Sequence, residues 1–204
     1  MLTFLLLPIA PTYCEDHCQA TYTSLSENLD HVIASHQQGT PAFFDALHNV
    51  EEALFSAFQQ CPDNPLLLSL MGETQISLGN AQLAYLYAKK AITLKGSYWQ
   101  TNHLLGTTLC LQGNYSEGVQ YLEVAARLAP HKPLLLFNLC SAYYAAKQYE
   151  KAVQTCTVFL ARQDHKLHGP AYHLRAQSYQ ALGKTKQARQ DFNNARVLEY
   201  SPPH

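Results

Sequence analysis

The stretch Trp99–Pro130, WQTNHLLGTTLCLQGNYSEGVQYLEVAARLAP, contains the signals that decide the fold. Apolar residues recur in it at helical spacing on both sides of Gly113-Asn114, and glycine and asparagine tolerate the positive φ that ends a helix. Pro130 cannot continue the second helix. We therefore predict two short helices joined by a tight turn. Gly106, inside the first helix, predicts a close approach of another helix, and we expect this position to tolerate alanine but not leucine.

The features of this stretch recur along the chain with a period of 34 residues. The small residues Gly72, Gly106 and Cys140 are spaced by this period, and so are the turns at 79–80, 113–114 and 147–148. A fourth copy arrives two residues late, which predicts a two-residue insertion in the loop 163–168. We define repeat one as residues 65–96, repeat two as 99–130, repeat three as 133–164 and repeat four as 169–200. One helix pair cannot bury its apolar faces alone, so neighbouring repeats must stack.

A self-repeat of 34 residues with helix–turn–helix content resembles the tetratricopeptide repeat family. The resemblance is strong over residues 64–200 and weak over 24–62. The chain departs from the family pattern at Gly118 and Phe159, which replace small alanines, and such departures indicate looser joints. The resemblance implies an all-α, right-handed solenoid of antiparallel helix pairs, with about ten helices. It also implies a non-catalytic role in protein–protein interaction.

The repeat frame predicts the organisation of the whole chain as one domain. We expect an export signal and N-terminal segment over 1–20, a degenerate first repeat or capping hairpin over 21–62, four repeats over 63–200 and a disordered tail over 201–204. The hairpin is predicted as helices over 24–38 and 41–60. Residues 2–10 are apolar and uncharged, as in a secretory signal, and a packed apolar segment is the alternative. This run is too short to span a bilayer, which needs about 20 apolar residues.

Charge is distributed unevenly along the chain. Residues 1–88 contain nine acidic residues and no lysine or arginine, whereas residues 89–204 contain 14 basic and six acidic residues. A solenoid would therefore have an acidic end and a basic end, which favours head-to-tail self-association or steering of a polarised partner. Drift on solvated surfaces is the alternative, because salt screens exposed charges over roughly 8 Å.

The cysteines leave alternatives open. Cys18 can pair with Cys61 in an oxidising compartment or stay unpaired. Cys140 and Cys156 occupy interface positions of repeat three, where we expect them to act as small hydrophobic residues, with a bridge between facing helices as the alternative. Cys14 lies close to Cys18 and His17, but no second ligand cluster is evident, so we expect no metal and no cofactor.

No nucleophile elbow, phosphate-binding loop or dinucleotide fingerprint is present, so we do not expect an enzyme. The basic residues of repeat four lack interleaved aromatic residues, so we expect no nucleic-acid partner. The repeat frame instead predicts a peptide-binding groove on the first helices. Its residues are His103, Thr107, Cys110, Phe137, Asn138, Ser141, Tyr144, His173, Gln177 and Gln180. Such a groove suits a largely uncharged extended peptide, although Phe137 and Tyr144 can alternatively pack against neighbouring helices.

The sequence thus favours a protein-interaction scaffold of the cell envelope, periplasmic or secreted, that binds an extended segment of a partner protein. A cytoplasmic location is the alternative. A chaperone or assembly factor for a secretion or surface apparatus is a second interpretation of the function. A metal- or redox-linked module is a third, which rests only on Cys14, Cys18 and the histidines.

Overall fold

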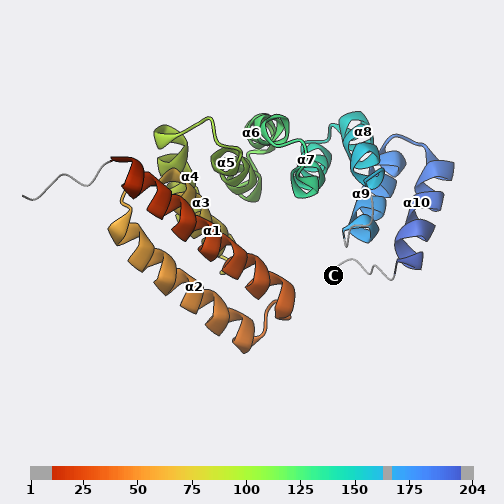
Figure 1. The fold of residues 1–204 in the computed structure, drawn as a ribbon. Coiled ribbons are helices and arrows are strands. Elements are labelled where there is room, and N and C mark those ends of the chain that lie inside the picture. Colours follow the sequence, from red (N-terminus) through yellow and green to blue (C-terminus); the bar gives the residue numbers. More distant parts are fainter. Residues whose placement is uncertain (1–10, 163–166, 199–204) are drawn as a thin grey trace, which may run out of the picture. The chain divides into compact units, whose positions relative to one another are not determined.

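The computed structural model describes residues 11–162 and 167–198. Ten α-helices and no strand are found within these ranges (Figure 1). They are α1 (Pro11–Ser35), α2 (Pro41–Gln60), α3 (Pro65–Ser77), α4 (Ala81–Leu94), α5 (Trp99–Leu111), α6 (Tyr115–Leu128), α7 (Pro133–Ala145), α8 (Tyr149–Leu160), α9 (His168–Ala181) and α10 (Thr185–Val197). The predicted all-α class and number of helices are therefore confirmed. The apolar run 2–10 and the tail 201–204 lie outside the described residues.

The chain divides into two compact units, Met1–Lys95 and Gly96–His204, where the sequence had suggested a single domain. In the first unit, α1 packs along α2, as Figure 1 shows in red and orange, and both helices contact α3. The core contains large aliphatic side chains from three helices, among them Leu29, Leu47, Leu54 and Leu67. Helix α4 then packs on α3 as the second helix of repeat one.

Helix α1 begins at Pro11, so the predicted start near residue 24 is wrong. Ser24 lies in the interior of the helix and does not cap it. The extension has a physical reason, because Cys18 and Tyr22 continue the apolar face of Leu25 and Leu29 toward the N-terminus at helical spacing, and all four pack in one core. The face that was predicted for 24–38 is therefore longer than its apparent cap suggested.

A disulfide joins α1 to the C-terminal end of α2 in the first unit. Cys18 and Cys61 are bonded, with their Cα atoms 5.9 Å apart, and both side chains are buried. The pairing that the sequence left open is therefore present. It closes a hairpin that has no repeat before it in the described chain.

The predicted turns lie where the period requires them. Gly79, Gly113 and Gly183 have φ between +72° and +83°, and Lys147 takes the same left-handed conformation at φ 59°. Each of these residues follows the last turn of a first helix, as in a common helix C-terminal motif. At the N-terminal end of α3, Asn64 Oδ1 accepts hydrogen bonds from the backbone N–H groups of Leu66 and Leu67 and caps the helix.

The second unit contains the helix pairs α5/α6, α7/α8 and α9/α10. In repeat two the two helices meet at glycines. A Cβ atom on Gly106 would lie 2.7 Å from Leu122 Cγ and 2.8 Å from the carbonyl oxygen of Gly118. A Cβ atom on Gly118 would in turn lie 2.8 Å from the carbonyl oxygen of Gly106. The expectation that Gly106 tolerates alanine is therefore wrong, because a backbone oxygen cannot easily move away.

In repeat three, Cys140 and Cys156 form a second disulfide, with their Cα atoms 5.5 Å apart. The expectation that they act only as small hydrophobic residues is wrong, and the bridging alternative holds. Both side chains are fully buried, within a core cluster that also contains Leu139 and Tyr143. The bond thus fixes α7 to α8 from inside the core.

Candidate functional site

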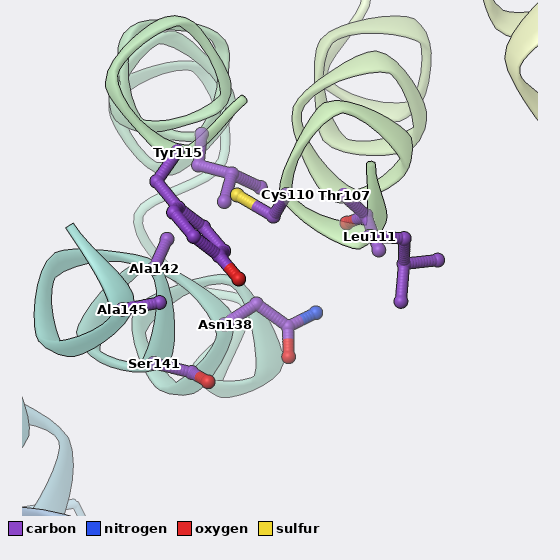
Figure 2. Close-up of a pocket in the computed structure, with 9 residues that line it drawn as sticks. Thr107, Cys110, Leu111, Tyr115, Asn138, Ser141, Ala142 and Ala145 are labelled. Carbon is purple, nitrogen blue, oxygen red and sulfur yellow. The ribbon is translucent and has the colours of Figure 1, made fainter. Parts of the chain in front are cut away.

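The second unit contains a pocket of about 250 Å³ between α5, α6 and α7 (Figure 2). We call it the α5–α7 pocket. Its lining residues are Thr107, Cys110 and Leu111 from α5, Tyr115 and Leu122 from α6, and Asn138, Ser141, Ala142 and Ala145 from α7. None of these nine residues carries a charge. The pocket therefore lies between the first helices of repeats two and three, where the groove was predicted.

The floor and the rim of the pocket differ in burial. Leu122 and Ala142 are buried at the floor, and Cys110 is half-buried beside them. At the rim, Leu111 is 56% exposed and Tyr115 is 39% exposed, both large values for apolar residues. Figure 2 shows the Tyr115 ring between Cys110 and the side chains of α7, with its hydroxyl toward Asn138. The pocket thus has an apolar interior and an apolar rim that is accessible from solvent.

One side of the pocket is polar. The side-chain nitrogen of Asn138 lies 2.7 Å from His103 Nε2, so the amide donates and the ring nitrogen accepts. This bond links α7 to α5 and leaves the Asn138 carbonyl oxygen, an acceptor, as its other polar end. His103 itself is buried behind the pocket, with its ring centroid 6.4 Å from that of Trp99. It therefore acts on the pocket through Asn138.

Thr107 adds a hydroxyl to the polar side. Its oxygen is buried and has no hydrogen-bond partner in the described structure. Other buried hydroxyls of first helices are bonded to a backbone carbonyl one turn back, as Thr108 is to Leu104 and Thr74 is to Leu70. A buried hydroxyl without a partner costs free energy, roughly 1–3 kcal/mol. Thr107 thus contributes a buried hydroxyl to the pocket that has no partner among the described residues.

Cys110 is the one free cysteine among those whose side chains the structure describes. Burial raises the pKa of its thiol. Its sulfur also limits the approach of α6, because a Cβ atom on Gly118 would lie 2.6 Å from it. A raised pKa disfavours the nucleophilic thiolate, so the residue is suited to packing and not to catalysis.

The structure gathers four of the ten predicted groove residues at the pocket: Thr107, Cys110, Asn138 and Ser141. The two aromatic candidates of repeat three contact rings of the same repeat. The ring centroid of Phe137 lies 5.7 Å from that of Phe159, and the ring centroid of Tyr144 lies 5.8 Å from that of Tyr149. These contacts match the packing alternative that the sequence left open.

The three candidates of repeat four do not line the pocket. The ring of His173 contacts that of Phe192 on α10 at 5.3 Å, and burial lowers the pKa of this histidine. Gln177 is half-buried and Gln180 is exposed. The groove was predicted to extend over repeats two, three and four. In the structure, the predicted residues that line the pocket come only from repeats two and three.

Repeat four contains instead a buried ion pair that the sequence reasoning missed. Arg175 donates two bonds to the Asp191 carboxylate, of 2.7 and 2.9 Å, and a third of 3.0 Å to the Thr157 hydroxyl of α8. Its guanidinium also lies 5.5 Å from the ring centroid of Tyr172. These contacts tie α8, α9 and α10 together and are structural in character.

The sequence reasoning also missed the five apolar and small residues of the pocket, which are Leu111, Tyr115, Leu122, Ala142 and Ala145. It counted only the inward positions of first helices, whereas Tyr115 and Leu122 lie on the second helix of repeat two. One signal was available. Leu111 and Tyr115 are large apolar residues directly beside the polar Gln112–Asn114 turn, outside the apolar face of either helix.

None of the helices within residues 11–162 and 167–198 is long and apolar enough to cross a lipid bilayer. Within the same ranges, no three side chains among histidine, cysteine, aspartate and glutamate come together as a group that could hold a metal ion.

Comparison with known proteins supports the repeat frame. Two family models, both described as tetratricopeptide repeat, match residues 109–173 and 169–195. Among solved structures, MamA from Desulfovibrio magneticus RS-1 is similar with a TM-score of 0.66 and 18% identity, covering 90% of this chain and 96% of that one. No curated protein matches the sequence significantly.

A second solved structure, a putative kinesin light chain of Podosopora anserina with TPR-like repeats, matches with a TM-score of 0.63 at 16% identity. The match covers 90% of this chain and 94% of that one. At such low identities the solved structures support the fold alone, whereas the family models support the assignment of the repeat. The period, the helix pairs and both family models agree that residues 109–195 are tetratricopeptide repeats, and the solved structure of MamA shows the same fold over 90% of the chain.

Proposed function

We propose that this chain is a non-catalytic scaffold that binds an extended, largely uncharged segment of a partner protein in the α5–α7 pocket. The tetratricopeptide repeat fold supports protein–protein interaction as the general role. The observation that carries the finer proposal is the pocket itself, which has an apolar floor and an unsatisfied hydroxyl and lacks charged lining residues. An acidic or basic segment would lose hydration there without gaining an ionic partner.

The rim residues supply the contact area for such a segment. Leu111 and Tyr115 are exposed although both are large and apolar, and exposed apolar groups next to a pocket are typical of interaction sites. Tyrosine is also enriched among residues that contribute most to binding, because its ring buries a large area with few rotatable bonds. Because both residues are exposed, their truncation should affect binding without destabilising the fold.

A peptide library displayed on phage and selected on the purified chain tests this function. Selected peptides should bind the parent and bind the Tyr115→Ala variant at least tenfold more weakly, since an interface aromatic often contributes about 2 kcal/mol or more. Val158→Ala is the matched control, because Val158 is an exposed apolar residue of α8 outside the pocket. Failure to select any peptide, or equal binding to parent and Tyr115→Ala, would contradict the proposal.

We further propose that the protein works in an exported compartment, periplasmic or extracellular. The two cysteine pairs support this location, because disulfides persist in oxidising compartments and are rare in the cytosol. The test is thiol labelling of protein that is acid-quenched directly from its native cells, together with N-terminal sequencing. Four reactive thiols at Cys18, Cys61, Cys140 and Cys156, on a chain that keeps Met1, would point to the cytoplasm instead.

A further inference from the structure

The size and the lining of the pocket indicate what kind of side chain it recognises, and this inference rests on the function proposed above. We propose that the α5–α7 pocket is an anchor site for one large apolar side chain, of leucine, isoleucine or methionine type, and that the Asn138 carbonyl oxygen accepts a hydrogen bond from the adjacent backbone N–H. The occupant is thus a partner segment with a single uncharged aliphatic anchor. The pocket size, its lining and the Asn138–His103 bond carry this inference separately.

The size of the pocket sets the size of the side chain. An apolar cavity of roughly 150 Å³ is enough to hold a benzene molecule. The α5–α7 pocket, at about 250 Å³, therefore accommodates a complete leucine or methionine side chain. Alanine or glycine would leave most of the volume unfilled and would forfeit dispersion contacts with the floor.

The lining sets the polarity of the side chain. The floor presents the Cys110 sulfur, Leu122 and Ala142, and the Tyr115 ring covers one side. A carboxylate or ammonium group placed there would be desolvated without a counter-charge, which is costly. An aliphatic side chain gains instead about 25 cal/mol for each Å² of apolar surface removed from water.

The bond between Asn138 and His103 sets which backbone group is recognised. Because one N–H of the Asn138 amide donates to His103 Nε2 over 2.7 Å, that N–H is engaged within the protein and the orientation of the amide is fixed. The carbonyl oxygen remains, and it is an acceptor with two lone pairs. An extended peptide beside its anchor side chain presents a backbone N–H that matches this acceptor. His103 is therefore a positioning residue for the site.

Two equivalent alanines have different surroundings in repeats three and four, which gives a matched pair of variants. Ala145 lines the pocket on the last turn of α7, and Ala181 occupies the corresponding last turn of α9, 36 residues later because of the two-residue insertion. Ala181 does not line the pocket. Ala145→Leu should fill the cavity, whereas Ala181→Leu adds the same atoms at an exposed site elsewhere.

The Cys110 thiol provides a direct readout of occupancy. Its alkylation by iodoacetamide is followed by mass spectrometry at mildly alkaline pH, in a Cys14→Ser background under non-reducing conditions that leave both disulfides intact. The probes are N-acetyl-leucinamide, N-acetyl-glycinamide and N-acetyl-glutamic acid amide, at equal millimolar concentrations. The leucine probe should slow alkylation at least twofold, and the glycine and glutamate probes should leave the rate unchanged.

The variants complete the test. Ala145→Leu and Tyr115→Ala should each abolish protection by the leucine probe, and Ala181→Leu should retain it, with thermal melts confirming that all three are folded. Equal effects of the three probes, or no protection by any, would overturn the anchor site. If phage-selected peptides still depend on Tyr115 in that case, the scaffold function stands and only its aliphatic anchor fails.

Discussion

Repeats two and three bring their two helices together at the same place by opposite means. In repeat two, Gly106 on α5 meets Leu122 on α6, and the absence of a side chain on the glycine lets the helices touch. In repeat three, the positions 34 residues later are Cys140 and Cys156, which are covalently bonded. The two helices of each repeat therefore lie close together at this pair of positions. In repeat two a glycine makes this possible, and in repeat three a disulfide joins the two side chains.

The two repeats depend on different contacts between their helices. Repeat two relies on backbone proximity, since Gly106 and Gly118 each place a carbonyl oxygen where the other's side chain would be. Repeat three relies on a bond that a reductant can break. The α5–α7 pocket lies between these two pairs, so its walls come from one repeat of each kind.

The largest effect is expected from removing the repeat-three disulfide. The Cys140→Ala/Cys156→Ala double variant should lose about 3 kcal/mol of unfolding free energy, because a bond that closes a loop of roughly 15 residues restricts the unfolded chain by that amount. Urea unfolding under non-oxidising, non-reducing conditions measures it. Cys110→Ala is the control, since it removes a cysteine without opening a disulfide. Coincident urea midpoints of parent and double variant would show that the bond contributes nothing.

The next effect is expected from adding one carbon to repeat two. Gly106→Ala should cost about 1–3 kcal/mol, because the new Cβ atom overlaps Leu122 Cγ and the Gly118 carbonyl oxygen. Thermal and urea unfolding measure this cost. The cost should shrink in a Leu122→Ala background, where one of the two overlaps is gone. If Gly106→Ala costs the same in both backgrounds, the contact with Leu122 is not the source of strain.

The equivalent positions and the helix boundaries of the two repeats could be predicted from the sequence. The disulfide could not, because it depends on a tertiary contact. The period predicted that Gly106 and Cys140 are equivalent, and the turns predicted the helix boundaries closely. The disulfide could have been inferred from Cys140 and Cys156 being spaced as Gly106 and Leu122 are, but only after the close contact of those two positions was known. Sequence reasoning treated Cys140 as one of several small residues and so preferred packing.

The candidate site was predicted in part for a similar reason. Helical periodicity identifies the inward face of each first helix, and this found Thr107, Cys110, Asn138 and Ser141. It could not find Tyr115, because a pocket wall from the second helix depends on how that helix is placed against its neighbours. Nor could it show that His103 is bonded to Asn138, which requires the distance between two repeats.

The junction between repeats two and three offers the smallest of the three effects. The Tyr143 hydroxyl on α7 donates to the Glu123 carboxylate on α6, and Lys151 of α8 lies 3.7 Å from the same carboxylate. Burial first, and then the bond and charge of Glu123, raise the pKa of Tyr143 well above its ordinary value near 10. Because Glu123 is 40% exposed, we expect Tyr143→Phe to cost about 1.5 kcal/mol at neutral pH, the low end for a bond to a charged group.

The sign of the pH dependence follows from the direction of the shift. With its pKa raised in the folded state, Tyr143 holds its proton more tightly there than in the unfolded chain, so its contribution is complete below pH 10 and falls as pH rises above that value. Urea unfolding between pH 8 and 11 should therefore show the parent losing its advantage over Tyr143→Phe. Tyr149→Phe, on α8 and outside this bond, controls for general alkaline destabilisation. A parent-to-variant difference that stays constant to pH 11 would mean that the Tyr143–Glu123 bond does not link the two repeats.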